Sequence, residues 1–267
     1  MAMPTALISS AAVFGILYAD SNAELLHAQS GPTTQHSMPV IFKSSERRTA
    51  LLELYTSEGC SSCPPAETWL SRLKDSPGLW KDFVPIAFHV DYWDHLGWRD
   101  KWGSKAFSER QQTYAQSWHS DSVYTPGFVL NGREWRAWPG LKNGPSASSL
   151  QVGVLEVTST DLSHWHVEFS SLHANPSNFE FHAALLVSDL SSEVKAGENR
   201  GRRLVHDFVA LELAKGVLST SGKAALGDFT FHGTRKGAEG RLAVAVWLSS
   251  PGSLEPVQAT GGWLPER

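Results

Sequence analysis

Two cysteines separated by two serines are the residues of this sequence best suited to chemistry. Cys60 and Cys63 are the only cysteines of the chain, and Ser61 and Ser62 lie between them. A pair at this spacing stores two electrons: a thiolate on the first sulfur attacks a disulfide, and the second sulfur resolves the resulting mixed disulfide. The pattern therefore predicts thiol–disulfide exchange, with Cys60 as the nucleophile and Cys63 as the resolving thiol.

The surrounding residues predict that the cysteines lie where a strand turns into a helix. Residues 50–55 form a short apolar run typical of a buried strand, and apolar residues recur at helical spacing between residues 66 and 73. Proline is tolerated in the first helical turn, so Pro64 predicts a helix that starts at or next to Cys63. The helix dipole would stabilise a thiolate at Cys60 and lower the pKa of that thiol.

Two other interpretations of the cysteine pair stay open. One is a structural disulfide, or two buried thiols, that only pins the turn, since exported proteins keep such bonds. The other is a copper or zinc site that combines Cys60 and Cys63 with His89 or His95, because thiolate and imidazole suit both metals. Exchange itself needs no cofactor, since the cysteine pair carries the electrons.

The order of apolar runs predicts an α/β region followed by an all-β region. Strand-like residues 83–92, a helical stretch at 105–118 and a strand at 128–130 follow the cysteines, which predicts a mixed sheet with flanking helices over residues 49–140. Residues 140–149 read as a linker. The all-β, sandwich-like subdomain predicted for residues 149–267 rests on β-type runs at 152–157, 164–169, 179–187, 204–213, 228–232, 242–248 and 257–263.

The N-terminus has the pattern of a signal peptide. Residues 6–19 are uncharged and mostly apolar, too few for a membrane span, and small residues favour cleavage after Ala23. Residues 1–23 are therefore predicted to be removed, and residues 24–48 are predicted to form a flexible segment. The protein is then expected to be exported to the periplasm or secreted, with no stable membrane span after cleavage. If the apolar segment is retained as a structural element instead, the protein is cytoplasmic.

Composition narrows the class of partner. The 267 residues carry a net charge of −4, which offers no basic face for nucleic acid. Two cysteines also cannot build a four-thiolate zinc site. The expected partners are protein thiols or disulfides, acting as substrate or as electron partner.

Together with the cysteine motif, residues 125–132 (TPGFVLNG) resemble the thioredoxin-like superfamily, whose members place a cis-proline opposite the CxxC. The resemblance implies that Pro126 is this cis-proline and that the backbone of Thr125 pairs with a substrate chain. It also puts Glu53 near the position of the acid that thioredoxins bury beneath the second cysteine. There Glu53 would relay a proton to or from Cys63; equally, it is an ordinary strand residue that faces solvent.

A closer resemblance is to a group of exported bacterial proteins known only as domain of unknown function number 1223. It implies a thioredoxin-like core with an extra all-β subdomain, and it implies no activity. The sequence departs from thioredoxin itself at Gly59, where an aromatic residue is usual, and at the two serines of the motif. The residues that carry the resemblance are 53–66, 89–94 with Gly97 and Trp98, 109–111, 124–126, and 197–202 with Leu204 and His206.

Three further features have both a functional and a structural interpretation. Trp93 and Trp98 follow a strand end, where α/β sites form, although most of the tryptophans are expected to fill the core. The polar loop 198–203 docks near the cysteines or is a simple turn. Arg110 pairs with Asp91 or Asp94, or is solvated.

Overall fold

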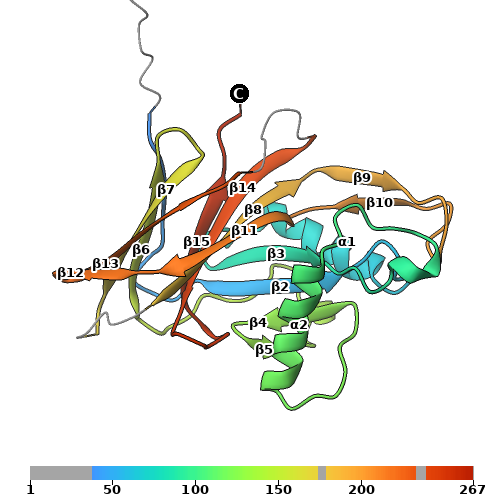
Figure 1. The fold of residues 1–267 in the computed structure, drawn as a ribbon, viewed down its shortest axis with the longest axis horizontal. Coiled ribbons are helices and arrows are strands. Elements are labelled where there is room, and N and C mark those ends of the chain that lie inside the picture. The colour runs from blue at the N-terminus through green and yellow to red at the C-terminus, as the bar shows by residue number, and fades with distance from the viewer. Residues whose placement is uncertain (1–37, 174–178, 233–238, 267) are drawn as a thin grey trace, which may run out of the picture. The chain divides into compact units, whose positions relative to one another are not determined.

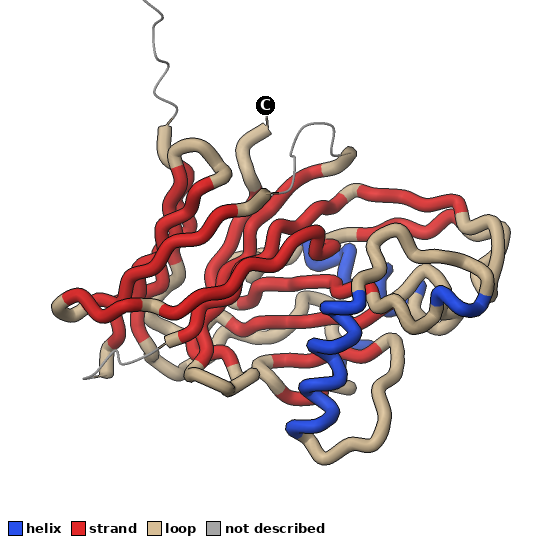
Figure 2. The backbone as a smooth tube through the Cα atoms, in the orientation of Figure 1, coloured by secondary structure: helices blue, strands red, loops and turns tan. Residues whose placement is uncertain are grey.

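The structure is an α/β fold in which strands far outnumber helices. The computed structural model describes residues 38–173, 179–232 and 239–266. Figure 2 shows many strands and only a few short helical pieces in this part. The predicted signal peptide and residues 24–37 lie outside the described residues. No helix in the described ranges is long and apolar enough to cross a membrane. The mixed α/β class predicted from the sequence is confirmed, with a stronger β character.

A mixed sheet of eight strands forms the centre of the described structure (Figure 1). Its order is β15-β14-β8-β11-β3-β2-β4-β5. The strands are β2 (Ala50–Thr56), β3 (Phe83–His89), β4 (Gly127–Leu130), β5 (Arg133–Glu134), β8 (Glu180–Ser188), β11 (Val209–Val217), β14 (Arg241–Ser249) and β15 (Pro256–Trp263).

One parallel contact joins the two halves of this sheet. Strands β2 and β3 run parallel, and β11 lies parallel to β3 on its other side, with Val209 opposite Ala87. The Ala87 N–H donates to the Phe208 carbonyl oxygen at 2.8 Å. The segments predicted as separate domains on either side of residues 140–149 therefore share one sheet, and the chain from residue 37 onward forms one compact unit.

A second sheet of five strands packs against the β8–β14 end of the first. Its order is β1-β6-β7-β13-β12, and every regular element described after residue 149 is a strand, as the sequence predicts. Strand β1 lies inside the segment predicted to be flexible, and it pairs with β6 through four residues. The strands are β1 (Val40–Lys43), β6 (Gly153–Ser159), β7 (His164–Ser171), β12 (Ser219–Ser221) and β13 (Ala224–Thr230).

Alternation along β2 determines which side chains reach which helix. Leu52 and Leu54 pack in a core cluster with helix α1 (Pro64–Arg72), whereas Leu51 and Tyr55 belong to the cluster packed against helix α2 (Lys105–Ser117). Successive strand residues point to opposite faces of a sheet. The two helices therefore cover opposite faces of the strands that precede the site.

A hairpin leaves the central sheet beside α1. Its strands are β9 (Leu190–Glu193) and β10 (Arg203–His206), which pair only with each other. The single strand predicted over residues 204–213 is wrong, because the chain turns between β10 and β11 at Phe208, whose φ is +58°. Short 3₁₀ turns complete the structure at Leu73–Asp75, Asp94–Leu96 and Trp138–Gly140.

The packing of His182 generates a pH prediction. The imidazole of this β8 residue stacks on Trp247 of β14, with ring centroids 5.3 Å apart, and burial together with the cation of Arg110 lowers its pKa to about 4. The unfolded chain takes up this proton near pH 6.5, whereas the folded protein takes it up only near pH 4. Stability is therefore present above pH 6.5 and is lost as the pH falls towards 4.

We expect His182→Phe, which keeps the ring but cannot titrate, to remove up to about 3 kcal/mol of this acid-induced loss. Urea unfolding at pH 7 and pH 4 measures the difference between the variant and the wild type. His173→Phe, at an exposed histidine, is the control. Equal pH dependence in the wild type and in His182→Phe would contradict the assignment.

Candidate functional site

The two cysteines form a disulfide at the start of α1. Cys60 and Cys63 are bonded, with their Cα atoms 5.5 Å apart. Strand β2 ends at Thr56, a turn follows, and α1 begins with Pro64 directly after Cys63 as its N-terminal cap residue. The strand, the turn and the helix start predicted from the sequence are all confirmed. The positive end of the α1 dipole therefore lies at the disulfide, although Pro64 and Pro65 carry no N–H and the N–H groups of Ala66 and Glu67 donate to the Cys63 carbonyl oxygen.

The segment before β4 lies against the disulfide. The Thr125–Pro126 peptide bond is cis. The Cys60 sulfur lies 3.7 Å from the Thr125 carbonyl oxygen and 3.3 Å from the hydroxyl of Ser62, which itself donates to the same carbonyl at 3.4 Å. Predicted site residues Cys60, Cys63, Thr125 and Pro126 thus come together.

An open cavity lies beside this proline. It has a volume of about 390 Å³. Apart from Arg136 it is lined by aromatic rings and the proline itself, which is the chemistry of a surface that binds an apolar peptide side chain. The residues that line it are Tyr124, Pro126, Phe128, Trp135, Arg136 and Trp138.

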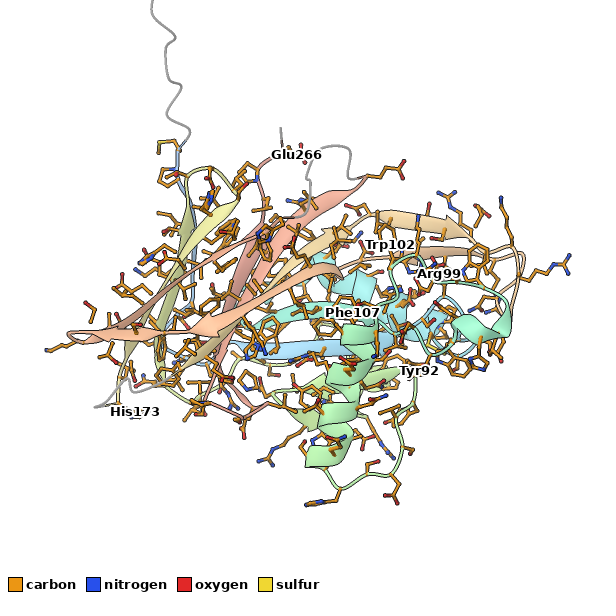
Figure 3. The ribbon with its side chains drawn as sticks, viewed as in Figure 1. Tyr92, Arg99, Trp102, Phe107, His173 and Glu266 are labelled. Atoms are coloured by element: carbon orange, nitrogen blue, oxygen red, sulfur yellow. A yellow bond between two sulfur atoms is a disulfide. The ribbon has the colours of Figure 1, made fainter. Side chains whose placement is uncertain are left out.

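Both tryptophans singled out in the sequence reach the cysteine turn. The indole N–H of Trp93 donates to the Thr125 hydroxyl at 2.8 Å, and a Cβ at Gly59 would lie 2.9 Å from Trp93. The indole N–H of Trp98 donates to Glu58 at 2.6 Å. Figure 3 shows Tyr92, Arg99 and Trp102 of the same β3–α2 connection at the end of the sheet where β9 and β10 lie. Because Gly59 has no side chain, Trp93 can pack directly against the cysteine turn.

The loop of the β9–β10 hairpin closes over the other side of the turn. The side-chain amide of Asn199, which is fully buried, donates to the carbonyl oxygens of Glu58 and Cys60 at 2.8 Å each. The carboxylate of Glu198 accepts the Ser61 N–H at 3.0 Å, and hydrogen bonds from the Ser61 hydroxyl and from this N–H lower the pKa of Glu198. The docking interpretation of loop 198–203 is confirmed. Under this cover Cys60 is 1% exposed and Cys63 is fully buried.

Behind the turn lies a buried group of carboxylates that the sequence analysis missed. Glu67 of α1 accepts hydrogen bonds from the Thr56 hydroxyl at 2.5 Å and from His206 Nδ1 at 2.6 Å. Glu58 Oε1 lies 3.2 Å from His206 Nε2. Burial lowers the pKa of His206, but the two glutamates outweigh it and raise that pKa to about 10. In the sequence Glu67 lies one helical turn after Cys63, and this spacing could have indicated that its carboxylate lies near the disulfide.

His89 lies beside this group, at the end of β3. Its Nδ1 is 2.7 Å from Asp100, and its ring centroid is 5.1 Å from that of His206. Burial opposes ionisation of Asp100, yet His89 and two backbone N–H donors lower its pKa to about 2. The predicted cysteine–histidine metal set does not form. His95 is exposed and bonded to the Tyr92 carbonyl oxygen, and the cysteines are bonded to each other.

Glu53 lies away from the disulfide. It is fully buried on the α2 face of β2, whereas the cysteines precede α1 on the other face. Arg110 of α2 binds both of its oxygens, at 2.8 and 3.0 Å, and the hydroxyls of Tyr55 and Tyr114 donate to it at 2.8 and 2.6 Å. Arg110 therefore pairs with Glu53 rather than with Asp91 or Asp94, and this pair holds the α2 face together.

Removing one member of a buried ion pair leaves the other charge uncompensated, which costs about 3–5 kcal/mol. We expect Arg110→Met to lower the free energy of unfolding by this amount in urea titrations. Lys105→Met on the same helix breaks the exposed pair with Glu109 and should cost less than about 1 kcal/mol. A loss for Arg110→Met no larger than for Lys105→Met would show that Glu53 is not held by this pair.

The comparisons with known proteins agree with the motifs. A model of the family described as "Protein of unknown function (DUF1223)" matches residues 51–249. No curated protein matches the sequence significantly.

Two solved structures have a similar fold. Protein AGR_C_4864 from Agrobacterium tumefaciens is 23% identical, with a TM-score of 0.58 over 82% of this chain and 95% of that one. HBP35 of Porphyromonas gingivalis is 14% identical, with a TM-score of 0.54 over 83% of this chain and 76% of that one. At such identities the likeness concerns the fold alone.

Proposed function

The chain belongs to the DUF1223 family of proteins of unknown function, and we propose that it is an exported thiol–disulfide oxidoreductase with a thioredoxin-like core. The observation that carries the proposal is the position of the Cys60 sulfur, 3.7 Å from the carbonyl oxygen that precedes the cis-proline. A substrate strand paired with the backbone of Thr125 would bring its own sulfur to Cys60. Protein thiols or disulfides are the proposed partners.

The proposed exchange follows from the two sulfurs. In the reduced protein, the Cys60 thiolate attacks a substrate disulfide, forming one mixed disulfide and releasing one substrate thiolate. The Cys63 thiolate then attacks Cys60, which releases the second substrate thiolate and restores the intramolecular bond. The N-terminus of α1 favours the Cys60 anion. The reverse sequence oxidises a substrate dithiol. Electrons and protons balance without a further cofactor.

Access to Cys60 requires movement of the hairpin loop. The sulfur is covered in the closed form, and Asn199 is the side chain that holds the loop to the turn through two hydrogen bonds. The carboxylate of Glu198 adds a third contact, because it accepts a hydrogen bond from the Ser61 N–H. A substrate that displaces this loop would expose the Cys60 sulfur and free that N–H for the thiolate.

The burial of both cysteines favours a second candidate, a scaffold or binding protein in which the disulfide is a permanent staple. Structural disulfides have reduction potentials below about −300 mV, whereas exchange-active pairs lie between about −270 and −120 mV. We expect a value in the second range, measured by equilibration with glutathione or dithiothreitol and quantified by alkylation. A value below about −300 mV would favour the staple.

Exchange should depend on Cys60. Cys60→Ser is expected to abolish reduction of a model protein disulfide, and Cys63→Ser to accumulate the mixed disulfide, because the resolving thiol is gone. Thr68→Ala, at an exposed side chain of α1 whose hydroxyl donates to the Pro64 carbonyl oxygen, should keep the wild-type rate. Full activity in Cys60→Ser would remove the proposed nucleophile.

The hairpin loop should control the rate at which the disulfide is reduced. Asn199→Ala removes two hydrogen bonds to the turn, each worth about 1 kcal/mol, so we expect reduction by dithiothreitol to accelerate about tenfold or more. Asn143→Ala, at an exposed asparagine of another loop, is the control. Reduction of Asn199→Ala at the wild-type rate would mean that this loop does not restrict access.

A further inference from the structure

The buried residues behind the cysteine turn have the composition of a metal site. Glu58, Glu67, His89 and His206 are between 0 and 5% exposed. One possible ligand atom from each of Glu67, His89 and His206 lies within 4.8 Å of the others, and Glu58 Oε1 is 3.2 Å from His206 Nε2. The four residues come from the cysteine turn, α1, and the ends of β3 and β10.

Three atoms in this cluster lack a hydrogen-bond partner. They are His89 Nε2, His206 Nε2 and Glu58 Oε1, all buried. A buried polar atom without a partner costs free energy, so it needs an explanation. The contact between Glu58 and His206 has the distance of an ion pair but is not aligned for a hydrogen bond. A bound cation would give His89 Nε2 the partner that it lacks.

Each imidazole is also oriented as in a metal site. His89 Nδ1 is bound to Asp100, and His206 Nε2 faces Glu58 Oε1 at 3.2 Å. Metal-binding histidines usually donate one ring N–H to a carboxylate, which fixes the ring and leaves the other nitrogen for the ion. Here that arrangement occurs twice, and the two rings lie next to each other.

The charge of the cluster also favours a cation. Glu58, Glu67 and Asp100 are three buried carboxylates, and among the described residues no lysine or arginine forms an ion pair with any of them. A divalent ion would compensate two of the three negative charges of these carboxylates, and buried charges without a partner are costly.

We propose that His89 Nε2, His206 Nδ1 and Glu67 bind one divalent ion of the zinc class behind the disulfide, while Asp100 and Glu58 orient the two imidazoles. The ion would replace the proton that His206 Nδ1 donates to Glu67. Two imidazoles and one carboxylate are ligand types that Zn²⁺ takes, and a water would complete four-coordination. The ion would tie α1 to β3 and β10. The inference does not depend on exchange activity, since the ligands exclude both sulfurs.

The direct test is zinc binding by the untagged full-length chain with its disulfide intact. The protein is unfolded with a chelator, refolded with or without Zn²⁺, and titrated against a chromogenic chelator. We expect one zinc per chain, and a loss of affinity of about 100-fold or more in His89→Gln and His206→Gln. His166→Gln, at an exposed histidine bound to Asp228, is the matched control and should bind zinc like the wild type.

Cobalt spectroscopy covers the case in which a cluster variant does not fold. Co²⁺ bound to the wild type should give the intense visible bands of four-coordinate cobalt without a thiolate charge-transfer band. The spectrum should persist in a Cys60→Ser/Cys63→Ser variant. Zinc binding that survives in both histidine variants, a thiolate band, or refolded protein that retains no zinc would each overturn the proposal. Failure of exchange with intact zinc binding would overturn only the proposed function.

Discussion

The pairing of β11 with β3 is the constraint on which the site depends. One parallel contact joins the two halves into a single sheet. In this contact Val209 lies opposite Ala87, and the Ala87 N–H donates to the Phe208 carbonyl oxygen. Strand β10 ends three residues before Val209, so the same contact brings His206 to Glu67. The same strand belongs to the β9–β10 hairpin, and the loop of this hairpin carries Asn199 to the cysteine turn. Without this pairing, the cysteine turn would have neither its cover nor its histidine.

Short-range patterns in the sequence predicted those parts of the site that are formed by consecutive residues. The apolar run of β2, the proline at the helix start and the cysteine spacing are short-range signals, and they predicted the strand, the turn and α1 correctly. The cis bond before Pro126 came from the family resemblance rather than from periodicity. Trp93 and Trp98 were singled out because they follow a strand end. Trp98 donates to Glu58 of the cysteine turn, and Trp93 donates to Thr125, which lies against the disulfide.

The long-range pairings could not be read from the sequence. Apolar periodicity indicates that a strand exists but not which strand lies beside it, so the β3–β11 contact and the shared sheet stayed unpredicted. The same gap hid the cluster of Glu58, Glu67 and His206, whose members are separated by up to 148 positions. The face on which Glu53 lies depends on which helix packs on each side of β2, and that is a tertiary property.

The contact between β3 and β11 also bears on how the protein can be divided. A recombinant fragment that stopped near residue 150 would contain the cysteines, α1 and the cis-proline, and its length would suit a small thioredoxin-like protein. It would also present the apolar edge of β3 to solvent, where β11 normally lies. An unpaired hydrophobic strand edge invites association between chains. Such a fragment would be prone to aggregate through β3, so the intact polypeptide is the smallest sensible unit for biochemistry.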